Sequence, residues 1–83
     1  MTTESTFEVI QRLLAPFNTK GVAIKNETSF ALDLELDSLA FMDFVCEMED
    51  HFDIMIPLNI LPDLEAVSEV VEAVDKIVGE NRG

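Results

Sequence analysis

The stretch DSLAFMDFVCEMEDHF, from Asp37 to Phe52, predicts the central helix of this protein. Its apolar side chains cover about 200° of the circumference at 100° per residue, which indicates a helix packed on several sides. The remaining arc is short and acidic and carries Ala40, Asp43, Glu47, Asp50 and His51. Asp37 or Ser38 begins the helix. Cys46 falls among the apolar residues, where a thiol is most simply a small core side chain.

A shorter helix is predicted near the start of the chain. Ser5-Thr6-Phe7-Glu8 fits a capping box, in which the side chains of Ser5 and Glu8 each accept a hydrogen bond from the other's backbone amide. Apolar residues follow at helical spacing: Phe7, Ile10, Leu13, Leu14 and Phe17. Pro16 should end or distort this helix near Ala15, because proline lacks an amide and clashes with the preceding turn.

A long connection, from Asn18 to Asp37, joins these two helices. Connections of this length inside a compact domain are usually functional or pinned by buried side chains. The expected anchors are Val22, Ile24, Phe30, Leu32 and Leu34. The alternation of Leu32, Leu34 and Leu36 would also suit a short strand, but no partner strand is evident, so we predict an anchored loop.

The C-terminal third predicts a short helical turn and then a last helix. The turn lies between Pro57 and Pro62, where there is room for little more. Asp63 is expected to cap the last helix, and Gly79 is expected at its C-cap. Its apolar stripe has helical spacing and consists of Val67, Val70, Val71, Val74, Ile77 and Val78.

The fold class is therefore all-α: a four-helix bundle with a short third helix and a long loop between helices one and two. Eighty-three residues suffice for one small domain, which we expect to span residues 1–83. Cys46 is the only cysteine and cannot pair within the chain, which favours a reducing compartment. The start has no basic n-region, and no apolar run reaches the ~20 residues that span a bilayer. We expect a soluble, cytoplasmic protein without membrane insertion.

The formal charge of −12 is unevenly distributed. Between Asn26 and Asp75 there are fourteen of the seventeen acids and no lysine or arginine. Nucleic acids need basic surface to displace their counterions, and anionic membranes need it too, so neither is an expected partner. Such a field favours basic patches on protein partners.

Ser38 stands directly in front of the central helix, and catalytic chemistry does not explain it. A nucleophilic serine needs a base in reach, whereas His51, the only histidine, lies about 20 Å further along the same helix. Asp33-x-Glu35-x-Asp37 imitates half of an EF-hand loop, but Ser38 and Phe44 occupy the positions of its glycine and its bidentate glutamate. We therefore predict no catalytic residue and no metal site. A hydroxyl at a helix start is well placed to carry a phosphate ester.

The segment SFALDLELDSLAFMDFVCEMEDHFDIMIP, Ser29 to Pro57, resembles the acyl carrier protein family. The pattern is a loop phenylalanine, Asp-Leu, Asp-Ser-Leu at the start of an acidic helix, and a phenylalanine shortly before Ile-Pro. Here these are Phe30, Asp33-Leu34, Asp37-Ser38-Leu39, Phe52 and Ile56-Pro57. The likeness covers nearly the whole chain. Two departures are Glu35, where many members have glycine, and Ala40, where many fatty-acid carriers have an acid.

The resemblance implies that Ser38 receives 4'-phosphopantetheine from coenzyme A through a phosphopantetheinyl transferase, which also recognises the flanking Asp37 and Leu39. It implies a monomeric carrier, not an enzyme, that brings acyl thioesters to synthases, ligases or acyltransferases with basic docking patches, in fatty acid, specialised lipid or polyketide biosynthesis. The docking residues would be Asp43, Glu49 and Asp50, together with Glu47 of the exposed strip.

Apolar residues of the second and fourth helices and of the segment between them would sheath the acyl chain. The candidates are Met42, Val45, Cys46, Ile56, Ile60 and Val71, and for any one of them a plain core position is the favoured interpretation. The alternative function is an unmodified acidic adaptor of the same fold that binds basic partners through the central helix.

Overall fold

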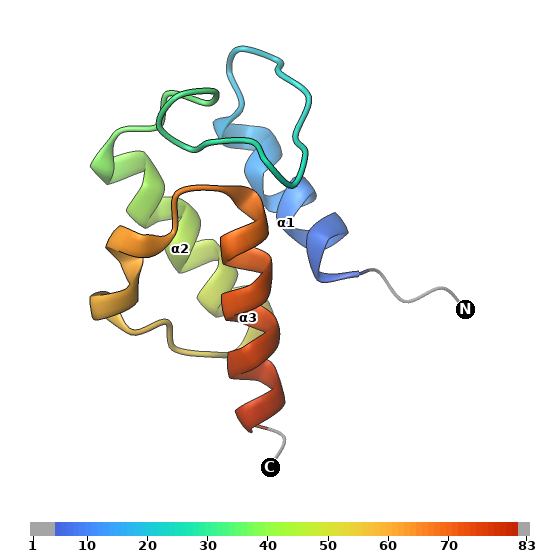
Figure 1. Ribbon diagram of the computed structural model, residues 1–83, viewed down its shortest axis with the longest axis vertical. Helices are drawn as coiled ribbons and strands as arrows, with labels where there is room; N and C mark the ends of the chain where they lie inside the picture. Colours follow the sequence, from blue (N-terminus) through green and yellow to red (C-terminus); the bar gives the residue numbers. More distant parts are fainter. Residues whose placement is uncertain (1–4, 82–83) are drawn as a thin grey trace.

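Helix α2 (Ser38–Phe52) has the predicted bounds and runs alongside the other helices (Figure 1). The computed structural model describes residues 5–81. The remaining elements are α1 (Thr6–Leu14), η1 (Ala15–Phe17), η2 (Leu58–Asp63) and α3 (Val67–Asn81), of which η1 and η2 are 3-10 helices. Within the described residues the only β pairing is an isolated bridge between Ser29 and Ala66. The all-α prediction is confirmed, and η2 is the short third helix.

Local capping signals place the first two α-helices. Ser5 Oγ accepts from the Glu8 amide at 3.1 Å, and Glu8 Oε1 accepts from the Ser5 amide at 3.0 Å. The hydrogen bond that the Ser5 amide donates to the Glu8 carboxylate is the main reason that the pKa of Glu8 lies below its ordinary value. Pro16 lies in η1, so the α-helix ends where proline predicts. At α2, Asp37 is the N-cap, and its Oδ1 accepts from the Ala40 amide at 2.8 Å.

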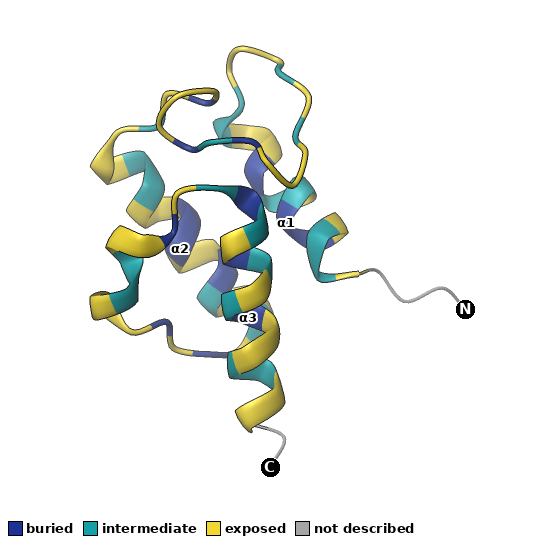
Figure 2. Cartoon of the chain, in the orientation of Figure 1, coloured by how far each residue is buried: buried dark blue, intermediate teal, exposed yellow. Residues whose placement is uncertain are grey.

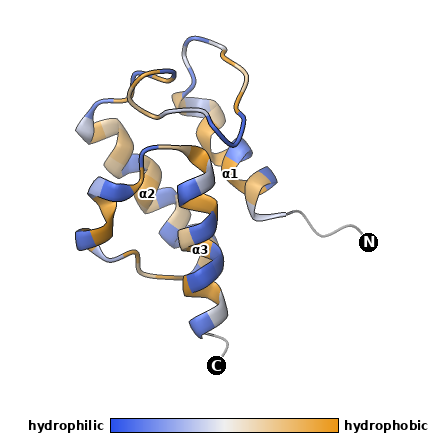
Figure 3. Ribbon diagram, viewed as in Figure 1, coloured by the Kyte–Doolittle hydropathy of each residue, from blue (hydrophilic) through white to orange (hydrophobic). Residues whose placement is uncertain are grey.

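The core lies between the three α-helices, with α1 packed against both α2 and α3 (Figure 2). Its largest fully buried side chains are Ile10, Leu14, Phe44, Met48, Val67, Val70 and Val74. Orange apolar segments accordingly face inward along the helices (Figure 3). The predicted inner faces of the first and last helices are thereby confirmed.

Helix α2 buries a narrower face than its sequence predicts. Phe44, Val45 and Met48 are buried, whereas Leu39 is 73% exposed and Met42 and Cys46 are also exposed. The prediction that Cys46 is a core thiol is wrong. The three exposed residues are spaced i, i+3 and i+7, so they form one apolar stripe on the side of α2 that no other described element covers.

The connection from Asn18 to Asp37 is a loop pinned to the start of α3. Phe30 and Leu34 are buried anchors as predicted, and Val22 and Ile24 pack partly buried against the core. Leu32 is 82% exposed, so its predicted role as an anchor is wrong. Figure 1 shows this loop arching over one end of the helices.

Capping of α3 differs from the prediction at both ends. Asp63 is the last residue of η2, and α3 begins only at Val67. The amides of Val67 and Ser68 donate instead to the carbonyls of Thr28 and Asn26 in the loop, at 3.0 and 2.9 Å. Gly79 is not a C-cap, because the helix continues to Asn81.

Two alanine substitutions test this assignment of helix caps. Asp37→Ala removes a side-chain acceptor from the first turn of α2 and should lower the free energy of unfolding by about 1 kcal/mol. Asp63→Ala removes the same charge but no cap, and should change the free energy of unfolding by less than about 0.5 kcal/mol. Urea denaturation followed by circular dichroism measures both. Equal losses for the two variants would contradict the assignment.

Candidate functional site

Ser38 is the first residue of α2 and its side chain is exposed. Asp37, the cap, comes directly before it, and the exposed Leu39 follows. Within the described residues the Ser38 hydroxyl has no hydrogen-bond partner, and its separation from His51 along α2 remains about 20 Å. The side chain is therefore available for modification but has no base to activate it.

The turn before Ser38 depends on Glu35. This residue has a φ of 53°, in the left-handed region that glycine enters without steric cost. The Glu35 carboxylate accepts a hydrogen bond from Lys20 Nζ, and the two exposed side chains form an ion pair across the loop. The neighbouring Leu34 and Leu36 face inward, and the Leu36 amide donates to the Phe30 carbonyl at 2.9 Å. The turn therefore forms although no glycine is present.

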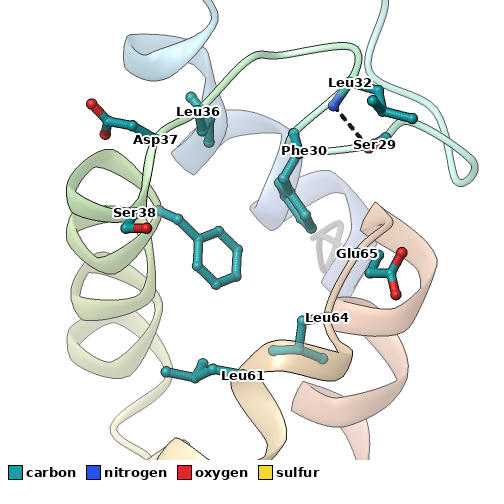
Figure 4. Close-up of a pocket in the computed structure, with 11 residues that line it drawn as sticks. Ser29, Phe30, Leu32, Leu36, Asp37, Ser38, Leu61, Leu64 and Glu65 are labelled. Atoms are coloured by element: carbon teal, nitrogen blue, oxygen red, sulfur yellow. Dashed lines mark hydrogen bonds between the residues drawn. The ribbon is translucent and has the colours of Figure 1, made fainter.

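A pocket of about 430 Å³ opens beside Ser38 (Figure 4). Three segments build it: the loop between α1 and α2, the first turn of α2, and η2 with its connection to α3. Its lining residues are Ser29, Phe30, Ala31, Leu32, Leu36, Asp37, Ser38, Phe41, Leu61, Leu64 and Glu65. Figure 4 shows Phe30, Leu61 and Leu64 around the opening, and Asp37 pointing away from it. The side chains around the opening are therefore largely apolar.

Aromatic rings form the inner wall of this pocket. The ring centroids of Phe30 and Phe41 are 5.3 Å apart, and those of Phe30 and Phe44 are 5.7 Å apart. Phe44 is fully buried and also meets Phe17 edge to face. Sequence reasoning missed most of this pocket, because its walls come from segments far apart in the chain. The one signal was the loop phenylalanine, Phe30.

The six residues predicted to sheath an acyl chain lie elsewhere. Met42 and Cys46 are exposed on α2, and Val45 and Ile56 are buried in the core. Ile60 and Val71 are partly buried against the core. None of the six lines the pocket beside Ser38, so their role in holding an acyl chain stays a prediction.

The four predicted docking acids divide into two groups. Asp43, Glu47 and Asp50 are exposed on α2. Glu49 is only partly exposed, and its Oε2 accepts from the Ile56 amide at 2.8 Å. The Glu49 carboxylate therefore fastens the segment after α2 to the helix, which is a structural role that its sequence position did not reveal.

Groups of metal ligands and membrane-spanning helices are both absent from the part of the chain that the structure describes. Residues 5–81 hold no group of three or more histidine, cysteine, aspartate or glutamate side chains placed to bind a metal ion. No helix over the same residues is long and apolar enough to cross a membrane.

Comparison of the sequence with known proteins identifies its family. The family described as "Phosphopantetheine attachment site" matches residues 8–74. A "Probable acyl carrier protein" of Caulobacter vibrioides is 34% identical over 58 residues, which are 70% of this chain and 67% of that protein. An "Acyl carrier protein" of Chlorobium phaeobacteroides is 42% identical over 55 residues, 66% of this chain and 67% of the other.

A "Meromycolate extension acyl carrier protein" of Mycobacterium tuberculosis is 36% identical over 58 residues, 70% of this chain but only 50% of that protein. The family match covers most of the chain, and the relatives are acyl carrier proteins. The chain therefore belongs to the acyl carrier protein family. The group that this family attaches is 4'-phosphopantetheine, and its members are carriers that interact with a phosphopantetheinyl transferase and with acyl-handling enzymes. The predictions of the family and of a non-enzymatic carrier are confirmed.

The role of Glu49 can be tested with graded substitutions. Glu49→Ala leaves the partly buried Ile56 amide without its acceptor and should lower the free energy of unfolding by about 1–3 kcal/mol. Glu49→Gln keeps an oxygen acceptor and should lose less. Asp50→Ala removes an exposed neighbouring charge and should cost less than about 0.5 kcal/mol. Chemical denaturation gives all three values, and a harmless Glu49→Ala would refute the structural role.

Proposed function

We propose that Ser38 is the attachment site of 4'-phosphopantetheine and that this chain carries acyl groups as thioesters to enzymes of lipid biosynthesis. The observation that carries the proposal is the exposed, unpartnered Ser38 hydroxyl at the start of α2, on the lining of an apolar pocket. We place the whole of residues 1–83 in one domain. The exposed, unpaired thiol of Cys46 suits a reducing cytoplasm.

The residues around Ser38 fit a phosphate ester. The Ala40 and Phe41 amides are already taken by the Asp37 side chain and carbonyl, whereas the Ser38 and Leu39 amides have no partner within the described residues. First-turn amides and the helix dipole favour an anion at this place. No lysine or arginine lines the pocket beside Ser38, so in this proposal the helix end supplies the stabilisation of the phosphate.

The attachment reaction needs a separate enzyme. The Ser38 oxygen would form a phosphodiester with the phosphopantetheine phosphate of coenzyme A, losing its proton as adenosine 3',5'-bisphosphate leaves. No histidine lies near enough on α2 to take that proton, so the base must come from the transferase. Asp37 and Leu39, which flank Ser38 on the surface, are the proposed recognition residues. Once attached, the group supplies a thiol that binds acyl chains as thioesters.

The exposed face of α2 is the proposed docking surface for partner enzymes. At 100° per residue, Met42, Cys46 and Leu39 are followed around the helix by Asp50, Asp43 and Glu47, so an apolar stripe lies beside an acidic one. A partner with basic side chains around an apolar patch complements both stripes. Glu49 is left out of this surface because its carboxylate is engaged with Ile56.

The relatives' names support the pathway class. They are acyl carrier proteins, and one of them is named for meromycolate extension. The acyl groups proposed for this chain are therefore intermediates of fatty acid or specialised lipid assembly. Polyketide assembly uses the same thioester chemistry, so we include polyketide intermediates among the proposed acyl groups.

Intact mass spectrometry tests the attachment site. Incubation with coenzyme A, magnesium and a broad-specificity phosphopantetheinyl transferase should add the mass of one phosphopantetheine to the wild-type protein. Ser38→Ala should gain nothing, and Ser29→Ala, which alters a second serine of the same pocket, should gain as much as wild type. No gain in unmodified wild-type protein, with a known carrier modified alongside, would favour the unmodified acidic adaptor.

Charge substitutions on α2 test the docking surface. The double variant Asp43→Asn, Asp50→Asn should lower kcat/KM of the transferase for this protein by about tenfold at low salt, because it weakens steering toward a basic partner. The difference should shrink as salt rises above about 0.1 M, where the Debye length is about 10 Å. Glu72→Gln together with Glu80→Gln removes two exposed charges from α3 instead. An equal loss in that control would contradict docking through α2.

A further inference from the structure

Phe41 lines the pocket beside Ser38, and we propose that its ring closes the inner end of this pocket and thereby limits the length of the acyl chain held there. The inference rests on the proposed attachment at Ser38. It assigns to this chain short, apolar acyl groups, held between the loop and the η2–α3 connection, and it gives Phe41 the role of a specificity-determining residue.

The placement of Phe41 makes this role possible. Phe41 stands one helical turn after Ser38, and both side chains line the same pocket. The group carried by Ser38 is therefore tethered at the rim of a pocket that has Phe41 in its wall. Because the lining is contributed by this chain alone and includes the proposed tether, the tethered group is the occupant to which we commit.

The surroundings of Phe41 explain why the ring acts as a barrier. It is partly buried, with its ring centroid 5.3 Å from that of Phe30 and 6.4 Å from that of Phe44. Of these two neighbours, Phe44 is fully buried in the core and Phe30 is buried at its edge by the loop. A chain that extends past this ring must separate Phe41 from two aromatic neighbours and enter a packed interior, where added volume is costly.

The lining narrows the chemical class of the acyl group. No lysine or arginine is among the lining residues, and the Asp37 side chain points away from the pocket (Figure 4). An acyl group that ends in its own carboxylate would find no cation to pair with there, whereas a saturated chain would meet the apolar surface of Leu61 and Leu64. The pocket therefore suits apolar acyl groups better than dicarboxylic ones.

The test uses acyl chains of increasing length attached to the whole of residues 1–83. A broad-specificity transferase loads Ser38 from acetyl-, butyryl-, hexanoyl-, octanoyl- and dodecanoyl-coenzyme A, and intact mass confirms each product before the melting temperature is measured. Each methylene that becomes fully buried should raise the melting temperature by about 3–6 °C. In the wild type the rise should stop at a short chain. In Phe41→Ala, compared with its own unacylated form, the rise should continue to longer chains.

Two further variants keep the experiment decisive. Phe41→Leu retains an apolar core contact, and the rise in its melting temperature should stop at an intermediate chain length. This variant covers the case in which Phe41→Ala folds poorly. Phe52→Ala removes a partly buried ring near the other end of α2, outside the pocket. The rise in its melting temperature should stop at the same chain length as in the wild type. A rise through dodecanoyl in the wild type, the same stopping point in all variants, or no rise at any length would overturn the inference. Failure to load Ser38 at all would instead overturn the proposed attachment.

Discussion

Backbone hydrogen bonds between the long loop and the start of α3 are the constraint on which the site depends. The Val67 amide donates to the Thr28 carbonyl at 3.0 Å, and the Phe30 amide donates to the Glu65 carbonyl at 3.1 Å. The first bond satisfies an amide that a helix start leaves without a partner, so the loop serves as the cap of α3. The second places Phe30 over the core, where it forms a wall of the pocket. Because Phe30 in turn accepts from Leu36, the same contact fixes the chain that leads into Ser38.

The sequence predicted those features whose causes are local. The capping box at Ser5, the end of α1 before Pro16 and the cap at Asp37 each involve groups within four residues of one another, and each is present. The cap of α3 was assigned wrongly to Asp63, because the carbonyls that serve it lie about forty residues earlier and leave no local pattern. The exposure of Leu32 and Cys46 likewise depends on what packs nearby, which hydrophobicity alone does not reveal.

The turn at Glu35 shows how a departure from the family pattern is accommodated. A left-handed conformation costs a residue with a side chain roughly 1–2 kcal/mol relative to the right-handed one. Here it lets Leu34 and Leu36 both face inward while Asp37 reaches the first turn of α2. The ion pair with Lys20 lies on the surface and contributes at most about 1 kcal/mol, so burial of the two leucines supplies the larger part of the compensation.

Ser38 lies at the boundary between two faces of α2 that have different tasks in the proposed function. On the wheel, Ser38 stands between Phe41, which belongs to the pocket, and Met42, which begins the exposed apolar stripe. A partner enzyme bound to the stripe and to Asp43 and Asp50 would therefore approach the tether without covering the pocket. The cargo could leave the pocket toward the partner by turning about Ser38, while the core packed behind Phe44 remains undisturbed. The separation of the two faces thus allows docking and release to proceed without a rearrangement of the fold.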